Sequence, residues 1–308
     1  MPTVTRRALL GTSAGIVAVA AVGTVFAYRQ SSLGTPVTRT ATTTPPVAGM
    51  LVGGRVRRAG STVPADFAWG QTQWGLLQVT RDYMGARTPT VYQIQFPPSC
   101  QVVLSFDTAA TLTPTFVASM TPRRTVFRHE PERPTEYGGT PTGGTTFRAD
   151  LAAFQTKMRA LDPTVLVGHA ASGYAYRGTH AGANGSYIIG STADFFTFDG
   201  YRAGTDYKAN AVIPLQNRAE FQKWYTYVKA TGKPWGVTEF GAGRCNEPGL
   251  VPTIVADRVS ATQSSVNWCR ANGAFCFSYF FSDVGPDGHN WMPTDAAFAT
   301  MYQGLTRA

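Results

Sequence analysis

Short apolar runs alternate with amphipathic segments from residue 48 to the end of the chain. Apolar residues recur at three- and four-residue steps over residues 148–161, 218–231 and 255–271, which predicts helices there. The shorter runs predict strands at residues 50–53, 90–96, 102–106, 125–128, 165–168, 195–198, 235–238 and 274–279. Eight strands with helical segments between them favour an α/β fold of the (β/α)8 TIM barrel type, in a single domain over residues 48–308.

Two parts of this barrel pattern are irregular. Only residues 97–101 separate the second and third expected strands, whereas a parallel crossover normally takes about a dozen residues or more. The position of one of these two strands therefore stays open. Residues 173–186 have little helical periodicity and predict a long loop in the fifth unit.

The first 47 residues differ from the rest in composition. Residues 1–27 carry Arg6 and Arg7 before an uncharged run over residues 11–27, which is typical of a twin-arginine export signal. A retained membrane anchor is the alternative, because a run of this length is near the short limit for a membrane span. Residues 28–47 are rich in Ser, Thr and Pro and predict an extended linker. We therefore expect a secreted or cell-envelope protein.

Composition excludes several classes of protein. Hydrophobic residues make up 43% of the chain and charged residues 15%, so the chain is not of the disordered type. The formal net charge is +9, but it is spread along the chain, without the Lys/Arg run and interleaved aromatics of a nucleic-acid groove. We expect a monomer without a nucleic-acid partner. The cysteines fit one or two disulfides of an exported protein, with the pairing open, at Cys100, Cys245, Cys269 and Cys276.

Two apolar runs end in a carboxylate. Residues 125–132 read TVFRHEPE and residues 234–241 read PWGVTEFG, which makes Glu130 and Glu239 the leading catalytic candidates. The carboxyl ends of parallel barrel strands meet at one rim, where catalytic groups lie. A pair of carboxyl groups there suits glycoside hydrolysis, in which one protonates the leaving oxygen while the other attacks the anomeric carbon or activates water.

Further ionisable or aromatic side chains follow other expected strands and are candidates for substrate binding: Asp107, Arg128, His129, His169, Asp199, Tyr201 and Trp291. Some of these could instead satisfy backbone donors at a strand end, which is the alternative for Asp107, His169 and Asp199. Glu132 is a rival acid, expected to pair with Arg128 or Arg133. The four histidines lack paired metal-ligand spacing and no phosphate loop is present, so no metal and no cofactor is expected.

The order of these motifs resembles the clan of retaining glycoside hydrolases built on (β/α)8 barrels, in which the acid/base ends strand four and the nucleophile ends strand seven. His129 before Glu130 is similar to glycoside hydrolase family 26, the β-mannanase and related endoglycanase family. Residues 195–201 and 238–241 also resemble that family's sixth strand and nucleophile strand. Residues 131–137 lack the aromatic segment usual in the family, so the resemblance concerns the reaction more than the substrate.

The resemblance implies a role for each residue. Glu239 would be the nucleophile and Glu130 the general acid and then base, with carboxyls about 5–5.5 Å apart. Tyr201 would donate a hydrogen bond to Glu239, with capping of the barrel mouth as the alternative. His129 would orient Glu130 or a sugar hydroxyl, and Trp291 would stack on sugar. The expected function is retaining hydrolysis of a β-linked polysaccharide or oligosaccharide, with a β-mannanase-like endoglycanase favoured. The alternative is a barrel that binds glycans without cleaving them, in an envelope or exopolysaccharide system.

Overall fold

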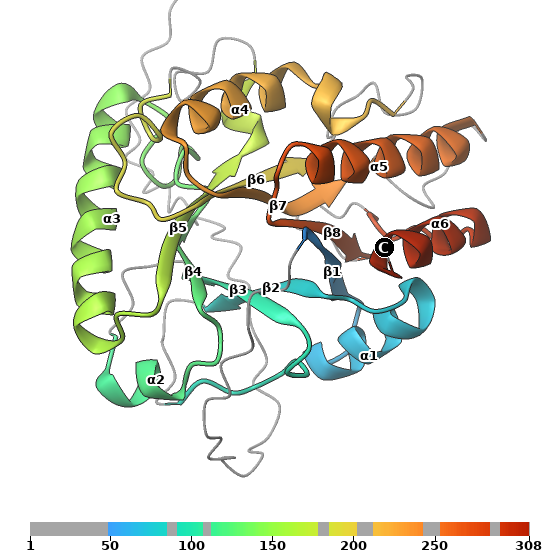
Figure 1. Ribbon diagram of the computed structural model, residues 1–308, viewed down its shortest axis with the longest axis horizontal. Helices are drawn as coiled ribbons and strands as arrows, with labels where there is room; N and C mark the ends of the chain where they lie inside the picture. Colours follow the sequence, from blue (N-terminus) through green and yellow to red (C-terminus); the bar gives the residue numbers. More distant parts are fainter. Residues whose placement is uncertain are drawn as a thin grey trace, which may run out of the picture.

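The computed structural model describes residues 49–84, 91–106, 112–177, 185–201, 212–242, 253–283 and 290–307. Within these ranges, eight strands form one sheet whose ladders are all parallel, in the order β1-β8-β7-β6-β5-β4-β3-β2 (Figure 1). The strands are β1 Leu51–Arg57, β2 Val79–Met84, β3 Gln101–Phe106, β4 Arg124–His129, β5 Leu166–Ser172, β6 Phe196–Tyr201, β7 Trp235–Gly241 and β8 Cys276–Ser282.

The two outermost strands, β1 and β2, bring the sheet close to a full barrel. They share no ladder, but the Gln78 amide donates to Val52 O at 3.0 Å and the Thr80 hydroxyl donates to Gly54 O at 3.0 Å. These bonds satisfy polar groups that would otherwise be left at the seam. The expected single-domain (β/α)8 barrel is therefore confirmed.

Helices surround the strands on the outside of the barrel (Figure 1). They are α1 Val63–Trp74, α2 Pro114–Ser119, α3 Pro141–Leu161, α4 Ala219–Thr231, α5 Thr253–Ala271 and α6 Ala296–Arg307, with the 3-10 turns η1 Gly173–Tyr176 and η4 Leu215–Asn217. The first three begin alike: a threonine hydroxyl (Thr62, Thr113 or Thr140) accepts from a first-turn amide, and a proline follows it. Both features favour helix initiation, because they satisfy a free amide and preset the backbone angle.

The barrel interior has an apolar layer at the amino-terminal ends of the strands. Its side chains come from almost every strand of the barrel and pack on one another: Leu51, Val79, Val103, Val126, Ala170, Phe195 and Cys276. The layer above it is polar and holds Arg81, Ser105, Thr197 and Asp199, all buried. The apolar layer closes one end of the barrel, so the polar groups face the carboxyl-terminal rim.

The prediction of the second strand was wrong. β2 is Val79–Met84, and the described residues 91–96 contain no strand. Its inward positions alternate, but Arg81 and Asp82 interrupt the apolar run that identifies a buried strand. The corrected position leaves residues 85–100 between β2 and β3, which is long enough for a parallel crossover.

The predicted disulfides do not form among the cysteines that the structure describes. Cys100, Cys269 and Cys276 are buried free thiols, and they fill apolar sites as small side chains do. Cys245 lies outside the described residues, as do the export signal and the linker. No helix in the described part of the chain is long and apolar enough to cross a membrane.

Candidate active site

Glu130 and Glu239 lie at the same rim of the barrel. Glu130 directly follows β4, and Glu239 stands near the end of β7, where it pairs in register with Asp199 of β6. Both glutamates are almost completely buried, with 2% and 4% of their surfaces exposed. Their partners differ, so their chemistry differs as well.

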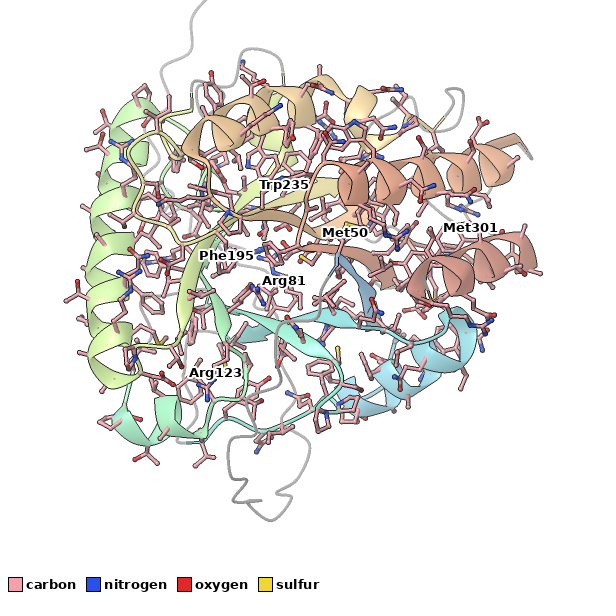
Figure 2. The ribbon with its side chains drawn as sticks, viewed as in Figure 1. Met50, Arg81, Arg123, Phe195, Trp235 and Met301 are labelled. Atoms are coloured by element: carbon pink, nitrogen blue, oxygen red, sulfur yellow. The ribbon has the colours of Figure 1, made fainter. Side chains whose placement is uncertain are left out.

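A fully buried arginine on β2 occupies the centre of the site. Figure 2 shows Arg81 in the middle of the ring of strands. Its guanidinium donates to Ser105 Oγ at 2.7 Å, Asp199 Oδ2 at 2.5 Å, Thr238 Oγ1 at 3.3 Å, Glu239 Oε1 at 3.3 Å and His129 Nδ1 at 2.7 Å. Arg81 was not among the predicted site residues, because the second strand was expected at residues 90–96. The remaining signal of a strand was its content of β-branched and aromatic residues, Val79, Thr80 and Tyr83.

Arg81 determines which nitrogen of His129 carries the proton. Because a guanidinium only donates, Nδ1 must accept, and the proton lies on Nε2, which faces Glu130 Oε2 at 3.7 Å. Burial lowers the pKa of His129 well below its usual value, and Arg81 and Arg133 lower it further. His129 is therefore a neutral donor directed toward Glu130.

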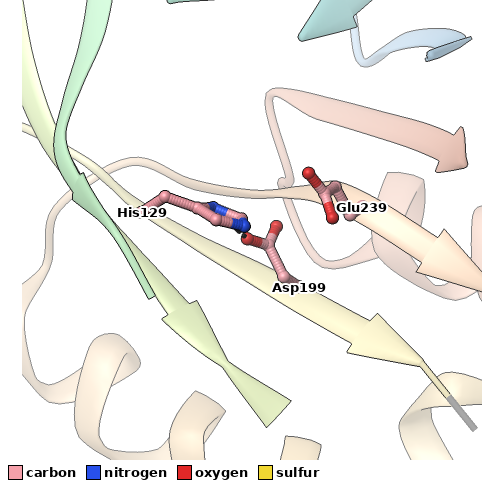
Figure 3. Close-up of side chains that lie close together, drawn as sticks. All are labelled: His129, Asp199 and Glu239. Atoms are coloured by element: carbon pink, nitrogen blue, oxygen red, sulfur yellow. Dashed lines mark ion pairs between the residues drawn. The ribbon is translucent and has the colours of Figure 1, made fainter. Parts of the chain in front are cut away.

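His129, Asp199 and Glu239 converge closely enough to suggest a metal site (Figure 3). Their ligand atoms lie within 4.8 Å of one another, and His129 Nδ1 is 3.5 Å from Asp199 Oδ2. The guanidinium of Arg81 already bonds to all three residues, so it takes the position and the charge of a cation. A metal ion there would have to displace a buried arginine from its two carboxylates, so these residues fit an ion poorly.

Glu239 receives two hydrogen bonds that favour its ionised form. Arg81 donates to Oε1, and the Tyr201 hydroxyl donates to Oε2. The Tyr201 ring is held between Phe280 and Trp291, with centroids 5.5 Å and 5.2 Å away. Burial raises the pKa of Glu239 to about 7, while Arg81 pulls that pKa downward. Burial also raises the pKa of Tyr201 well above 10, so its hydroxyl keeps the proton that it donates.

Glu130 projects from a strained turn. Arg128 and Glu130 have φ of 57° and 50°, in the left-handed region that few side chains adopt, and the β4–β5 register shifts beside them. The Glu130 amide donates to Ala170 O at 3.2 Å, and Arg133 Nη2 pairs with the carboxylate. Burial raises the pKa of Glu130 to about 7, and Arg133 opposes that rise.

Several predicted substrate-binding residues have other partners. His169 is fully buried and its Nε2 donates to Glu132 Oε1 at 2.8 Å, so it does not face a glycan, and Glu132 pairs with it and not with an arginine. Arg128 pairs with Glu136 at 3.2 Å.

Trp291 does not form an open stacking platform. Only 2% of its surface is exposed, and it packs on Tyr201 and Gly241. Its contribution is to fix Tyr201. Asp107 lies outside the described residues. The structure thus brings His129, Asp199 and Tyr201 together with the two glutamates.

Comparison with known proteins gives the fold. No family model matches the chain, and no curated protein matches it in sequence. Among solved structures, a triple variant of an endo-beta-1,4-glucanase from Xanthomonas axonopodis pv. citri has a TM-score of 0.51 at 11% identity, over 84% of this chain and 100% of its own. A GH128 (subgroup I) endo-beta-1,3-glucanase variant from Amycolatopsis mediterranei, complexed with laminarihexaose, has a TM-score of 0.50 at 16% identity, over 83% of this chain and 99% of its own.

The likeness is one of fold. It agrees with the barrel, but identities this low carry no residue roles and no substrate. The resemblance to family 26 and the identity of the catalytic residues stay predictions.

Proposed function

We propose that this protein is an exported retaining glycoside hydrolase that cleaves internal bonds of a β-linked glucan or a related β-glycan. The observation that carries the proposal is the pair of buried glutamates at one barrel rim, joined through Arg81 and His129. Two poorly solvated carboxyl groups near an arginine contribute little or nothing to stability. Such clusters are typical of sites where the groups serve a reaction. The endoglucanase folds of the neighbours favour β-glucan over mannan as the first substrate to test.

Glu239 is assigned as the nucleophile. Its two donors, Arg81 and Tyr201, stabilise the carboxylate, and the carboxylate attacks the anomeric carbon while the bond to the leaving oxygen breaks. As the glycosyl ester forms, Glu239 loses its negative charge, and its hydrogen bonds from Arg81 and Tyr201 weaken. In the second step, water attacks the anomeric carbon, the ester bond breaks, and the free carboxylate accepts from Arg81 again.

Glu130 is assigned as the acid and base. It gives its proton to the leaving oxygen in the first step and removes a proton from the attacking water in the second. His129 Nε2 faces its carboxyl at 3.7 Å. Burial raises the pKa of Glu130 to about 7, as it does that of Glu239, and the hydrogen bonds from Arg81 and Tyr201 assign the negative charge to Glu239 and the proton to Glu130.

The test is hydrolysis of laminarin, carboxymethylcellulose, β-mannan and xylan by the natural protein and by Glu239→Ala and Glu130→Ala. Glu136→Ala is the matched control, because Glu136 lies in the same loop but pairs with Arg128 outside the site. We expect turnover of at least one glycan, loss of at least about 1,000-fold with Glu239→Ala, and full activity with Glu136→Ala. NMR should show the β-anomer as the first product. An α-anomer first would contradict the retaining mechanism.

One observation favours the alternative of glycan binding without cleavage. The ion pair with Arg133 favours an ionised Glu130, which cannot donate a proton. A binder would take up laminarihexaose in calorimetry and leave every glycan of the panel intact. Turnover of any of them excludes this alternative.

Export is proposed from the leader alone. Residues 1–27 carry the paired arginines Arg6 and Arg7 before the uncharged run. Fused to a reporter that only the twin-arginine route carries, this leader should export it, and the double substitution Arg6→Lys with Arg7→Lys should abolish export. Recovery of the mature protein in the membrane fraction would favour a retained anchor.

A further inference from the structure

Glu130 is too enclosed to act on a substrate without a rearrangement. Only 3% of its side chain is exposed, yet a general acid must approach the leaving oxygen to within about 3 Å. Among the residues that the structure describes, the cationic or donor side chains that face its carboxylate are His129, at 3.7 Å, and Arg133. One of them must move before a glycan can take its place.

His129 is the less mobile of the two. Its Nδ1 accepts from buried Arg81 at 2.7 Å, and its ring packs edge-on against Tyr83 with centroids 5.5 Å apart. The backbone of Arg133 is also fixed, since its amide donates to Glu130 O and its carbonyl accepts from Glu136 and Gly138. The Arg133 side chain, by contrast, is 46% exposed. The guanidinium can therefore move into solvent, and the cost of leaving the buried Glu130 carboxylate unpaired is avoided when that carboxyl takes up a proton.

We propose that Arg133 is a displaceable counter-ion of Glu130: it pairs with the carboxylate in the free protein and is pushed off by the bound glycan, after which Glu130 takes a proton from solvent. This proposal rests on the proposed function. Arg133 is a positioning residue, because it acts through Glu130 and touches no reacting atom. Its displacement couples substrate binding to the protonation of the acid.

The electrostatics around the two glutamates support this order of events. The charged and titratable groups that act on Glu130 are Arg133, His129, Arg81, Asp199, Glu132 and Tyr201. Burial and the repulsion of Asp199 and Glu132 raise the pKa of Glu130, and Arg133 gives the largest opposing effect. Once Arg133 leaves, burial and the repulsion of Asp199 and Glu132 raise the pKa of Glu130 further. Glu239 keeps Arg81 and Tyr201, so the proton goes to Glu130 and the negative charge stays on Glu239.

The first test needs no turnover. In protein labelled with ¹³C at glutamate Cδ, the Glu130 signal is assigned with Glu130→Gln and titrated in the natural protein, in Arg133→Ala and in Arg123→Ala. Arg123 is the matched control, since it is 43% exposed and paired with Asp162 at 2.7 Å, but precedes β4 at the opposite rim. We expect Arg133→Ala to raise the midpoint by about one pH unit or more. Arg123→Ala should not change it.

The second test asks whether a glycan displaces Arg133. Saturating laminarihexaose should raise the Glu130 midpoint in Glu239→Ala, which does not cleave it, and leave the midpoint unchanged when Arg133→Ala is added to that variant. The pH profiles of hydrolysis of the same oligosaccharide give a further readout. The apparent pKa of the alkaline limb of kcat/KM reports the free enzyme, and it should rise in Arg133→Ala to the value found for the alkaline limb of kcat. The limb of kcat itself should not move, because Arg133 has already left in the complex.

The two proposals fail separately. Identical Glu130 midpoints in the natural protein and in Arg133→Ala would overturn the role of Arg133, whether or not the protein hydrolyses glycans. So would a midpoint that rises equally, on adding laminarihexaose, in Glu239→Ala with and without Arg133→Ala. Absence of turnover with a normal Arg133 effect on the midpoint would refute the proposed function and leave the counter-ion in place.

Discussion

Substitution of the buried arginine tests the electrostatic design of the site. Arg81→Met keeps most of the aliphatic volume and removes the guanidinium that bonds to Asp199 and Glu239. Both carboxyl groups then stay buried without their counter-ion. Breaking a buried ion pair by removing one partner costs about 3–5 kcal/mol, a large share of a typical stability of roughly 5–15 kcal/mol.

The size of this loss should depend on pH. Burial already raises the pKa of Asp199 and of Glu239, and Arg81 opposes both rises, so removing Arg81 raises both pKa values further. A group with a raised folded-state pKa stabilises the fold below its unfolded pKa and loses that contribution as pH rises through the folded value. The free energy of unfolding of Arg81→Met should therefore lie below that of the natural protein by about 3–5 kcal/mol at pH 8 and by under about 2 kcal/mol at pH 5. We call this difference the deficit of the variant.

Urea unfolding followed by tryptophan fluorescence at both pH values measures this difference. Arg124→Met is the control, because Arg124 bonds to the neutral Gln101 amide at 2.9 Å, and its deficit should not change with pH. A deficit for Arg81→Met that is equal at pH 5 and pH 8, or below about 1 kcal/mol at pH 8, would refute the view of Arg81 as counter-ion of two buried carboxylates.

Four further predictions follow from the same contacts. Tyr201→Phe removes the hydroxyl that donates to Glu239 and should lower kcat about 10- to 100-fold with little change in KM, measured on the best glycan of the panel. Gly241→Ala places a Cβ 2.8 Å from the Tyr201 ring and should lower kcat in the same way, although it touches no substrate. His169→Phe removes the imidazole that bonds to the buried Glu132 carboxylate, which keeps the Ser172 amide, and should cost about 1.5–3 kcal/mol, seen as a lower melting temperature in calorimetry; an unchanged melting temperature would contradict the pairing. The natural protein should lose stability in urea as pH rises from 4.5 to about 7, because the pKa of Glu239 is raised from 4.5 to about 7 on folding, and Glu239→Gln should flatten that slope.

The strand ends that carry the two glutamates could be predicted from local sequence. An apolar, β-branched run that stops at an ionisable group is an unambiguous pattern, and β4 and β7 both have it. β2 lacks it, because Arg81 and Asp82 lie within the strand itself. Arg81 could not be predicted, because a charged residue inside a strand breaks the hydrophobic pattern by which a buried strand is found. Its burial is tolerable only because its tertiary partners satisfy the charge, and those partners are the residues of the site.

The partners of the charged residues could not be predicted. Glu132 and His169 are far apart in sequence and meet because β4 and β5 are neighbours in the barrel. The ion pair between Arg133 and Glu130 depends on two positive φ angles at the end of β4. These angles occur at Arg128 and Glu130, and because neither residue is a glycine, the sequence does not indicate them. Burial of Trp291 likewise depends on the close approach allowed by Gly241.

The central claim is that Glu239 forms a covalent bond to the sugar. Incubation with a 2,4-dinitrophenyl 2-deoxy-2-fluoro-β-laminaribioside, followed by proteolysis and mass spectrometry, identifies the residue that carries the glycosyl group. We expect one adduct, on the carboxyl of Glu239, and none in Glu239→Ala. An adduct on any other residue, or hydrolysis of glycans by a protein that forms no adduct, would contradict it.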